Sequence, residues 1–114
     1  MSTVATQAKL WYWQRISAMV LAMFVLVHLA TLVYAVRGGL TAAEILGRTQ
    51  GSLAVAVFYG MFVIACAIHA PIGLARIAEE WLGLAPRLSN LAAGAFALAL
   101  LIFGLRAVYA LVAT

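Results

Sequence analysis

Two histidines lie within long apolar stretches of this chain, and one of them begins a pattern that could hold a cofactor. His69 is followed by Gly73, Arg76 and Glu80, a spacing that places all four residues on one face of a helix. A neutral imidazole is a good iron ligand, a glycine leaves room for a flat macrocycle, and an arginine can pair with carboxylates. The pattern predicts a haem site rather than a bare lipid-facing helix.

Other kinds of chemistry lack a second member near His69. No carboxylate or nucleophilic serine lies at its depth in the apolar stretch, so acid–base and acyl-transfer catalysis are disfavoured. A zinc site would need further ligands that one such chain does not supply. The single cysteine, Cys66, excludes an intrachain disulfide and a CxxC motif.

His28, in the first apolar stretch, has two explanations. It shares a helix face with Ser17, Phe24 and Thr31. An imidazole inside hydrocarbon is costly unless it hydrogen-bonds to a group of a neighbouring helix or ligates a metal. Both explanations stay open on the sequence alone.

The two histidines are expected at different depths. Arg15 and Arg76 mark the same membrane face, because one precedes the first apolar stretch and the other follows the second. At about 1.5 Å per residue, His28 lies about 20 Å and His69 about 10 Å from that face. Two axial ligands of one haem bind the iron from opposite sides and therefore lie at nearly the same depth. We therefore expect that the two histidines do not bind the same iron.

The composition defines the class of protein. The chain has 114 residues, of which 68% are hydrophobic and 9% charged, and its mean hydropathy is +1.14. A water-soluble domain of this size cannot bury so much apolar surface. A spanning helix needs roughly 20 residues, and three apolar stretches reach that length, at residues 16–36, 52–75 and 90–112. We therefore predict an all-α integral membrane protein with three transmembrane helices and one domain over residues 1–114.

The charged flanks predict the orientation and the surroundings. One end of the bundle is expected to carry Lys9, Arg15, Arg76 and Arg87, and the other Arg37, Arg48 and Arg106. By the positive-inside rule, this distribution places the N-terminus in the cytoplasm. The net charge of +4 suits the anionic headgroups of a lipid bilayer. We expect no nucleic-acid partner, because the chain has no aromatic–basic module.

Local signals between the first two spans predict a turn and a short helix. Residues 41–44 match a capping box for a surface helix that ends near Gly47. Residues 1–8 are expected to be extended. Pro71 predicts a kink just past His69, because it removes a backbone donor from the helix.

The third span is expected to start after a longer loop. Residues 76–88 are assigned to this loop, and Ser89 or Asn90 can cap the helix that follows. The helix is rich in Ala, Leu and Gly, which includes Gly94 and Gly104. Such small residues favour close packing against a neighbouring helix.

Three segments together resemble a known family. They are QRISAMV at residues 14–20, HAPIGL at residues 69–74, and the pair Glu80-Trp81. With them, the chain is similar to the membrane-anchor (cytochrome b) subunits of succinate:quinone oxidoreductases, and most similar to the hydrophobic membrane anchor subunit of bacterial succinate dehydrogenase. The resemblance covers about residues 10–112 in length, span count and loop placement.

The resemblance implies a part in electron transport and the tricarboxylic acid cycle, within respiratory complex II or a fumarate reductase. A flavoprotein and an iron–sulfur subunit would bind the anchors at the cytoplasmic face of the bacterial inner membrane. Two anchor chains would pack into one helical bundle with haem b between them. Electrons would pass from succinate to a quinone near that face. The chain itself would not oxidise succinate.

The resemblance also implies roles for single residues. His69 falls on the haem-ligand position, and Arg15 on an arginine near the haem propionates and the quinone. Arg76 and Gly73 belong to the same expected haem surroundings. His28 is similar to the helix-one ligand of two-haem anchors and is a candidate ligand of a second haem iron.

The expected quinone site consists of Arg15, Ser17, Glu80 and Trp81. The family motif ends in Asp-Tyr, whose tyrosine hydrogen-bonds the quinone, whereas this chain has Glu80-Trp81 at the matching pair. The indole N–H of Trp81 can donate a hydrogen bond in place of the tyrosine hydroxyl.

Two functions from other classes remain as alternatives. In a haem-free assembly or scaffold subunit, both histidines would make hydrogen bonds between helices. A small multidrug-type transporter is less favoured, because proton-coupled export uses an acid within the membrane. No Asp or Glu lies within the predicted spans, and a fourth span is missing.

Overall fold

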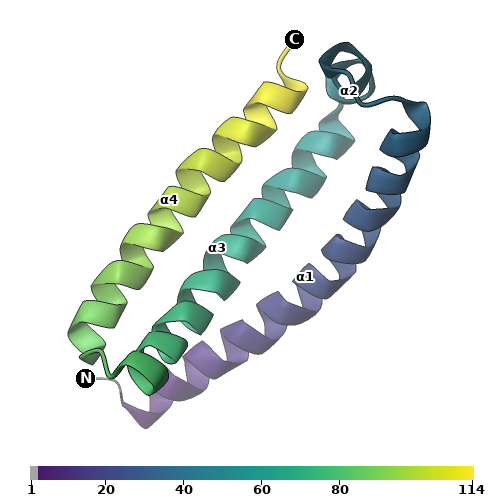
Figure 1. Cartoon of the computed structure of the whole chain (residues 1–114). Helices are drawn as coiled ribbons and strands as arrows, with labels where there is room; N and C mark the ends of the chain where they lie inside the picture. The colour runs from purple at the N-terminus through teal and green to yellow at the C-terminus, as the bar shows by residue number, and fades with distance from the viewer. Residues whose placement is uncertain (1–2) are drawn as a thin grey trace.

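The structure is a computed structural model that describes residues 3–114, and it is helical throughout (Figure 1). Its helices are α1 (Val4–Gly38), α2 (Ala42–Thr49), α3 (Leu53–Leu82) and α4 (Pro86–Val112). No strand occurs in the described part of the chain. Three helices, α1, α3 and α4, are long and apolar enough to cross a membrane, as the sequence predicts.

All three long helices extend beyond the predicted spans. α1 has 35 residues, which is about 52 Å at 1.5 Å per residue and exceeds the roughly 30 Å of a hydrocarbon core. The apolar pattern of the sequence identifies only the part of each helix that can lie in the hydrocarbon core, not the full length of the helix. The backbone hydrogen bonds continue through polar and aromatic residues until a cap or a turn ends them.

The N-terminal segment differs from the prediction. Residues 4–8 are helical rather than extended, and residues 1–2 lie outside the described residues. Thr3 is the N-cap, and its hydroxyl oxygen accepts a hydrogen bond from the backbone N–H of Thr6 at 3.1 Å. A threonine at this position satisfies one of the first free N–H groups and allows the helix to begin early.

The predicted capping box is confirmed at the start of α2. The Thr41 hydroxyl accepts from the N–H of Glu44 at 3.2 Å, and the Glu44 carboxylate accepts from the N–H of Thr41 at 3.3 Å. α2 ends at Thr49, slightly beyond the predicted Gly47. Its last residue is attached to α4, because the Thr49 hydroxyl donates to the carbonyl of Leu111 at 2.8 Å.

The loop between α3 and α4 is shorter than predicted. α3 continues through Pro71 and ends at Leu82, and the residue that caps it, Gly83, has a left-handed backbone with φ +65°. Pro86 is the first residue of α4, a position that suits its fixed φ and missing N–H. The cap therefore falls on Ala85, which has no side-chain hydrogen bond, and the prediction of a cap at Ser89 or Asn90 is wrong.

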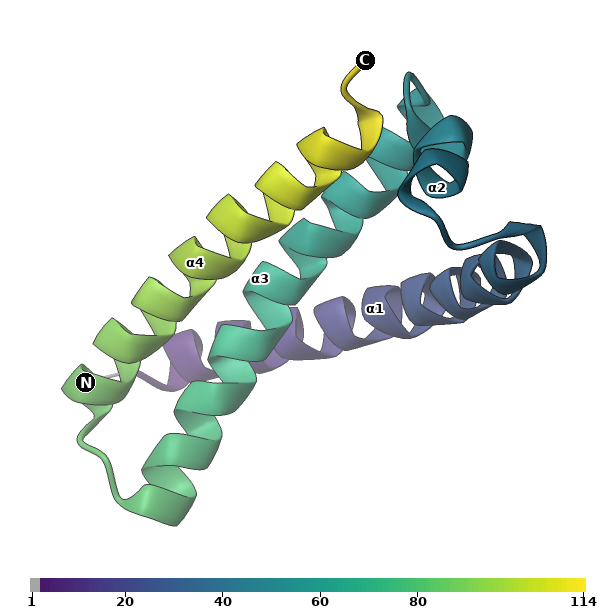
Figure 2. The same cartoon turned by 45° about the horizontal axis from the view of Figure 1, so that its top comes forward.

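α3 is the central helix of the arrangement. It packs along α4 and, less extensively, against α1, whereas α1 and α4 share no interface of similar extent. Figures 1 and 2 show α1 diverging from the other two helices toward the end that carries α2. The buried positions among residues 3–114 are small: Ser17, Ala65, Ala67, Pro71 and Ser89.

The glycines of α4 serve different purposes. A Cβ on Gly104 would lie 2.6 Å from Cγ1 of Val63, so this glycine allows α3 and α4 to approach closely. A Cβ on Gly94 would meet nothing within 4 Å. The predicted close packing therefore holds at Gly104 but not at Gly94.

Candidate functional site

His69 of α3 lies against Ser17 of α1. Its Nδ1 is 3.4 Å from the Ser17 hydroxyl oxygen, and that hydroxyl donates to the carbonyl of Gln14 at 3.1 Å. The hydroxyl has one hydrogen, so while it donates to Gln14 it can only accept from His69, and Nδ1–H of His69 is then the donor in the first bond. The hydrogen-bond network thus assigns a tautomer in which Nε2 keeps its lone pair.

This tautomer suits a metal ligand. Histidines that bind metals through one ring nitrogen generally donate a hydrogen bond from the other, which fixes the ring and raises its basicity. Ser17 is 4% exposed, so the acceptor that orients the ring is shielded from water. His69 could therefore ligate iron through Nε2 while Ser17 holds the imidazole.

The space beside Gly73 is filled by another side chain of the protein. A Cβ on Gly73 would lie 3.2 Å from Nε2 of Gln14, and Oε1 of Gln14 is buried without a hydrogen-bond partner in the described chain. On the side that faces α1, this glycine therefore admits Gln14. The space is not open to a macrocycle unless Gln14 moves.

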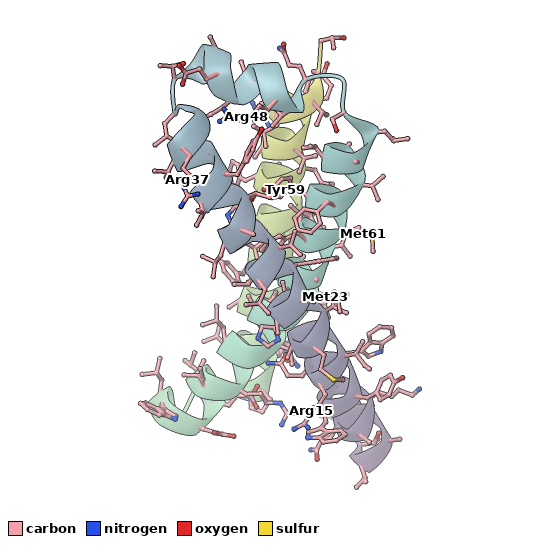
Figure 3. The ribbon with its side chains drawn as sticks, turned by 90° about the vertical axis from the view of Figure 1, so that its right-hand side faces the viewer. Arg15, Met23, Arg37, Arg48, Tyr59 and Met61 are labelled. Carbon is pink, nitrogen blue, oxygen red and sulfur yellow. The ribbon has the colours of Figure 1, made fainter. Side chains whose placement is uncertain are left out.

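Both predicted arginines lie at the end of the molecule that holds the start of α1. The Arg15 guanidinium lies over the Trp11 ring, 5.3 Å from its centroid, and its side chain is exposed. Arg76 is also exposed and follows His69 along α3 by about two turns. Figure 3 shows Arg15 at one end and Arg37 and Arg48 at the other, with Met23, Tyr59 and Met61 between them.

His28 belongs to a second hydrogen-bonded group. Its Nδ1 is 3.0 Å from the Tyr59 hydroxyl, which is 3.4 Å from the Thr31 hydroxyl. Thr31 donates its one hydrogen to the carbonyl of His28 at 2.7 Å. With that hydrogen used, the Thr31 hydroxyl can only accept from Tyr59. The Tyr59 hydroxyl then has no hydrogen left for His28, so Nδ1–H of His28 donates to Tyr59. The expected hydrogen bond between helices is confirmed, and Nε2 again keeps its lone pair.

The structure places the two histidines far apart along the helices. His69 lies beside Ser17, and His28 lies beside Tyr59, ten to eleven residues away on both α1 and α3. This separation is about 15 Å at 1.5 Å per residue. The aromatic rings of Phe24, Phe58 and Phe62 pack together between the same two helices. The prediction that one iron cannot be bound by both histidines is in agreement with this geometry.

The residues predicted for a quinone do not form one site within the chain. Ser17 is buried under His69, whereas Trp81 is 81% exposed and Glu80 is exposed at the end of α3. α1, α3 and α4 form a cavity next to Arg76, and neither these residues nor Arg15 line it. Among residues 3–114, moreover, no three His, Cys, Asp or Glu side chains are grouped so that they could hold a metal ion.

Two cavities were not apparent from the sequence. The first, which we call the Arg76 cavity, has a volume of about 570 Å³ and is lined by α1, α3 and α4, including Trp13, Arg76, Glu79 and Asn90. The second, the His28 cavity, has about 480 Å³ and includes His28, Tyr59, Phe62, Cys66, Phe96 and Phe103. Each combines residues from separate helices, so no spacing along the chain reveals it.

Glu79 and Ser89 form another contact that the sequence did not reveal. Ser89 is 1% exposed and donates a short hydrogen bond to the Glu79 carboxylate, which joins the end of α3 to the start of α4. The hydroxyl lies about one turn after Pro86, whose carbonyl is also within hydrogen-bond distance at 3.0 Å.

No protein-family model, no curated protein and no solved structure matches the chain. A function therefore has to be argued from the chemistry of the residues described above.

Proposed function

We propose that the chain is a membrane-anchor subunit of a succinate:quinone oxidoreductase in the inner membrane of a bacterium. The observation that carries the proposal is the orientation of His69, whose Nδ1 lies beside the Ser17 hydroxyl and whose Nε2 makes no hydrogen bond within the described residues. This imidazole lies on a helix long and apolar enough to cross a membrane. A histidine held in this way is suited to binding iron.

In this proposal, His69 binds haem b through Nε2, and Ser17 keeps the ring in place. Haem b supplies one-electron redox chemistry when it is bound. Arg15 and Arg76 lie at the same end of the chain, where each can pair with a propionate carboxylate. A second anchor chain would supply any further ligand to the same iron, because His28 is about 15 Å away.

Partner subunits supply the remaining parts of the enzyme. The chain is non-catalytic by itself, and a flavoprotein and an iron–sulfur subunit oxidise succinate and deliver electrons to a quinone. The exposed apolar side chains of α1 and α4, among them Leu26 and Phe103, support lipid and a second anchor chain as neighbours. Arg15, Ser17, Glu80 and Trp81 would contribute to the quinone site only with residues of these partners.

Two further possibilities have specific support. A cavity of about 480 Å³ that His28 lines, and an Nε2 that makes no hydrogen bond within the described residues, favour a second haem. The hydrogen bonds that both histidines make between helices favour a haem-free scaffold instead.

The test is a dithionite-reduced minus oxidised absorption spectrum of the mildly solubilised native complex, with haem quantified per copy of the chain. We expect a b-type spectrum with about one haem per two anchor chains. Two haems per pair would show that His28 also ligates, and a complex without a Soret band would support the scaffold. An unchanged spectrum in a complex that carries His69→Ala would contradict the ligand assignment.

A further inference from the structure

The lining of the Arg76 cavity changes character along its length. Trp13, Arg76, Glu79 and Asn90 lie at the end where α1 starts and α3 meets α4. Small or apolar residues extend the cavity toward the middle of α3 and α4, among them Ala67, Ile68, Pro71, Ala93, Gly94 and Ala97. A volume of about 570 Å³ with one polar and one apolar part suits an amphiphile.

Two side chains of opposite charge line the polar part. Arg76 and Glu79 are three residues apart on α3, a spacing that places them next to each other on one face of the helix. Within residues 3–114 no ion pair joins them, and the Arg76 guanidinium makes no hydrogen bond. The Glu79 carboxylate is fixed instead by Ser89, which is 1% exposed and donates a short hydrogen bond to it. A positive and a negative group are therefore available side by side.

Neutral donors and a helix end lie on the side of the positive group. Trp13 contributes an indole N–H and Asn90 an amide, and neither side chain makes a hydrogen bond within the described residues. Pro86 also lines the cavity, and α4 begins there without a side-chain cap, so its first backbone N–H groups add partial positive charge. Together with Arg76, these groups suit a phosphate, whose oxygens accept from arginine and from helix N-termini.

The Glu79 carboxylate determines which phosphate headgroup fits. An anionic headgroup next to Arg76 would place its phosphate near this negative charge without a cation to compensate it. A headgroup that carries an ammonium beside its phosphate can pair with both residues. The ammonium of ethanolamine has three N–H donors, whereas the quaternary ammonium of choline has none. A carboxylate held in place by Ser89 therefore favours ethanolamine over choline and over an anionic headgroup.

The apolar part has the length of one lipid leaflet. From Arg76 to Ala67 the cavity follows nine residues of α3, about 14 Å at 1.5 Å per residue. Half of a hydrocarbon core of roughly 30 Å is about 15 Å. Gly94 lines the facing wall, and a Cβ there would meet nothing within 4 Å, so space remains along α4. One acyl chain can lie in this space while its headgroup stays beside Arg76.

From this arrangement we infer that the Arg76 cavity binds one phospholipid with a zwitterionic ethanolamine headgroup. Arg76 and Asn90 donate to its phosphate, Glu79 accepts from its ammonium, and one acyl chain lies along α3 and α4. The site needs neither haem nor a partner subunit, so it does not depend on the proposed function. The bound lipid joins α3 to α4 at the end where Glu79 and Ser89 already connect them.

The experiment measures lipid binding to the full chain by native mass spectrometry in detergent micelles. Three phospholipids with identical acyl chains are added in turn, with ethanolamine, choline or glycerol as the headgroup. Glu79→Gln removes the proposed partner of the ammonium. Glu80→Gln is the matched control, because Glu80 is the next residue, is exposed and does not line the cavity. Arg76→Gln is compared in the same way with Arg87→Gln, and circular dichroism checks that each variant keeps its helix content.

We expect the wild type to bind the ethanolamine lipid about tenfold more tightly than either other lipid, which is the effect of one charged hydrogen bond. Glu79→Gln should abolish the preference for ethanolamine over choline and leave the affinity for the choline lipid unchanged, whereas Glu80→Gln should retain the preference. Arg76→Gln should weaken binding of the ethanolamine lipid about tenfold, and Arg87→Gln should not change it. Equal affinities for the ethanolamine and choline lipids in the wild type, or equal effects of Glu79→Gln and Glu80→Gln, would overturn the inference.

Two further comparisons separate this site from other contacts with lipid. Gly94→Leu places a side chain into the apolar part and should weaken binding of the ethanolamine lipid at least tenfold. Gly60→Leu should have no effect, because a Cβ there also meets nothing within 4 Å and Gly60 does not line the cavity. Equal binding by the two leucine variants means that the lipid lies elsewhere on the chain, and tightest binding of the glycerol lipid to the wild type identifies an anionic-lipid site. Either result contradicts the inference.

Discussion

At the scale of single residues, the two histidines are held by different hydroxyl groups. His69 donates to Ser17, whereas His28 donates to Tyr59, which in turn donates to Thr31. Each hydroxyl accepts from one group and donates to another, so the direction of every bond is determined by the number of hydrogens available. The two rings are thereby fixed with the same nitrogen directed at a neighbouring helix.

Ser17→Ala should weaken a haem at His69 without removing it. The variant leaves Nδ1–H of His69 without its acceptor, and the loss of such a partner typically lowers affinity about 10- to 100-fold. The haem content of the native complex should decrease, and the midpoint potential of the remaining haem should shift. Thr31→Val, on the same helix face, should leave both quantities unchanged. Equal haem content and potential in the wild type and Ser17→Ala would show that Ser17 does not position the ligand.

Tyr59→Phe should lower the free energy of unfolding by about 1 kcal/mol, because it interrupts the hydrogen bonds of both His28 and Thr31. Unfolding in mixed micelles at increasing SDS fraction measures the change. Tyr34→Phe is the control, since Tyr34 is exposed and keeps its ring beside Arg48. Strictly additive effects of Tyr59→Phe and Thr31→Val would argue against the proposed direction of these bonds.

At the scale of helices, glycines determine how closely two elements can approach. Gly104 brings α4 against Val63 of α3, and Gly39 lies in the left-handed half of backbone space with φ +107° between α1 and α2. In both places an added Cβ would meet a neighbouring side chain at less than the normal contact distance. At both positions the structure therefore requires a residue without a side chain.

Gly104→Ala should destabilise the pairing of α3 and α4 by about 1–3 kcal/mol, as overpacking of a tight contact does. Gly94→Ala is the matched control on the same helix, because a Cβ there meets nothing within 4 Å. The same SDS titration compares the two variants. Val63→Ala should restore part of the loss in Gly104→Ala, and a lack of rescue would mean that the contact with Val63 is not responsible.

Gly39→Ala should disrupt the turn before α2. Its Cβ would overlap the Glu44 carboxylate, which forms the capping box with Thr41, and its backbone conformation is strained for any residue with a side chain. We expect a loss of about 1–3 kcal/mol. Gly47→Ala, which meets nothing within 4 Å, should be nearly neutral. Equal stability of the two variants would contradict this account of the turn.

At the scale of the whole molecule, the charges gather at two ends and the apolar side chains face outward. Trp81 is 81% and Leu26 is 69% exposed, which is the reverse of a water-soluble fold. α1 leans away from α4, so the faces of these two helices are not covered within the chain (Figure 2). Such an exterior suits a lipid environment.

The proposed orientation predicts which end can be labelled from outside an intact cell. In a Cys66→Ala background, a membrane-impermeant maleimide should label Leu40→Cys but reach Leu82→Cys only after permeabilisation. Both leucines are exposed, and they lie at opposite ends of the three long helices. Labelling of Leu82→Cys alone would invert the orientation, and equal labelling of both would contradict α3 as a membrane span.

The sequence by itself determined the features that depend on neighbours within a few positions. Hydropathy identified the three long apolar helices, and the Thr41–Glu44 pair identified the cap of α2, because both effects act within one segment. The period of the helix also placed Ser17, His28 and Thr31 on one face of α1. Ser17 and His28 contact side chains of α3, and Thr31 donates to the α1 backbone at His28.

Only the tertiary structure decided what these faces meet. The crossing of α1 and α3 gives Ser17 to His69 and fills the space beside Gly73 with Gln14. The junction of three helices forms the Arg76 cavity, and the early start of α4 directs Ser89 to Glu79 rather than to a cap. Such contacts depend on the angle and register between helices, which the order of residues along one helix does not specify.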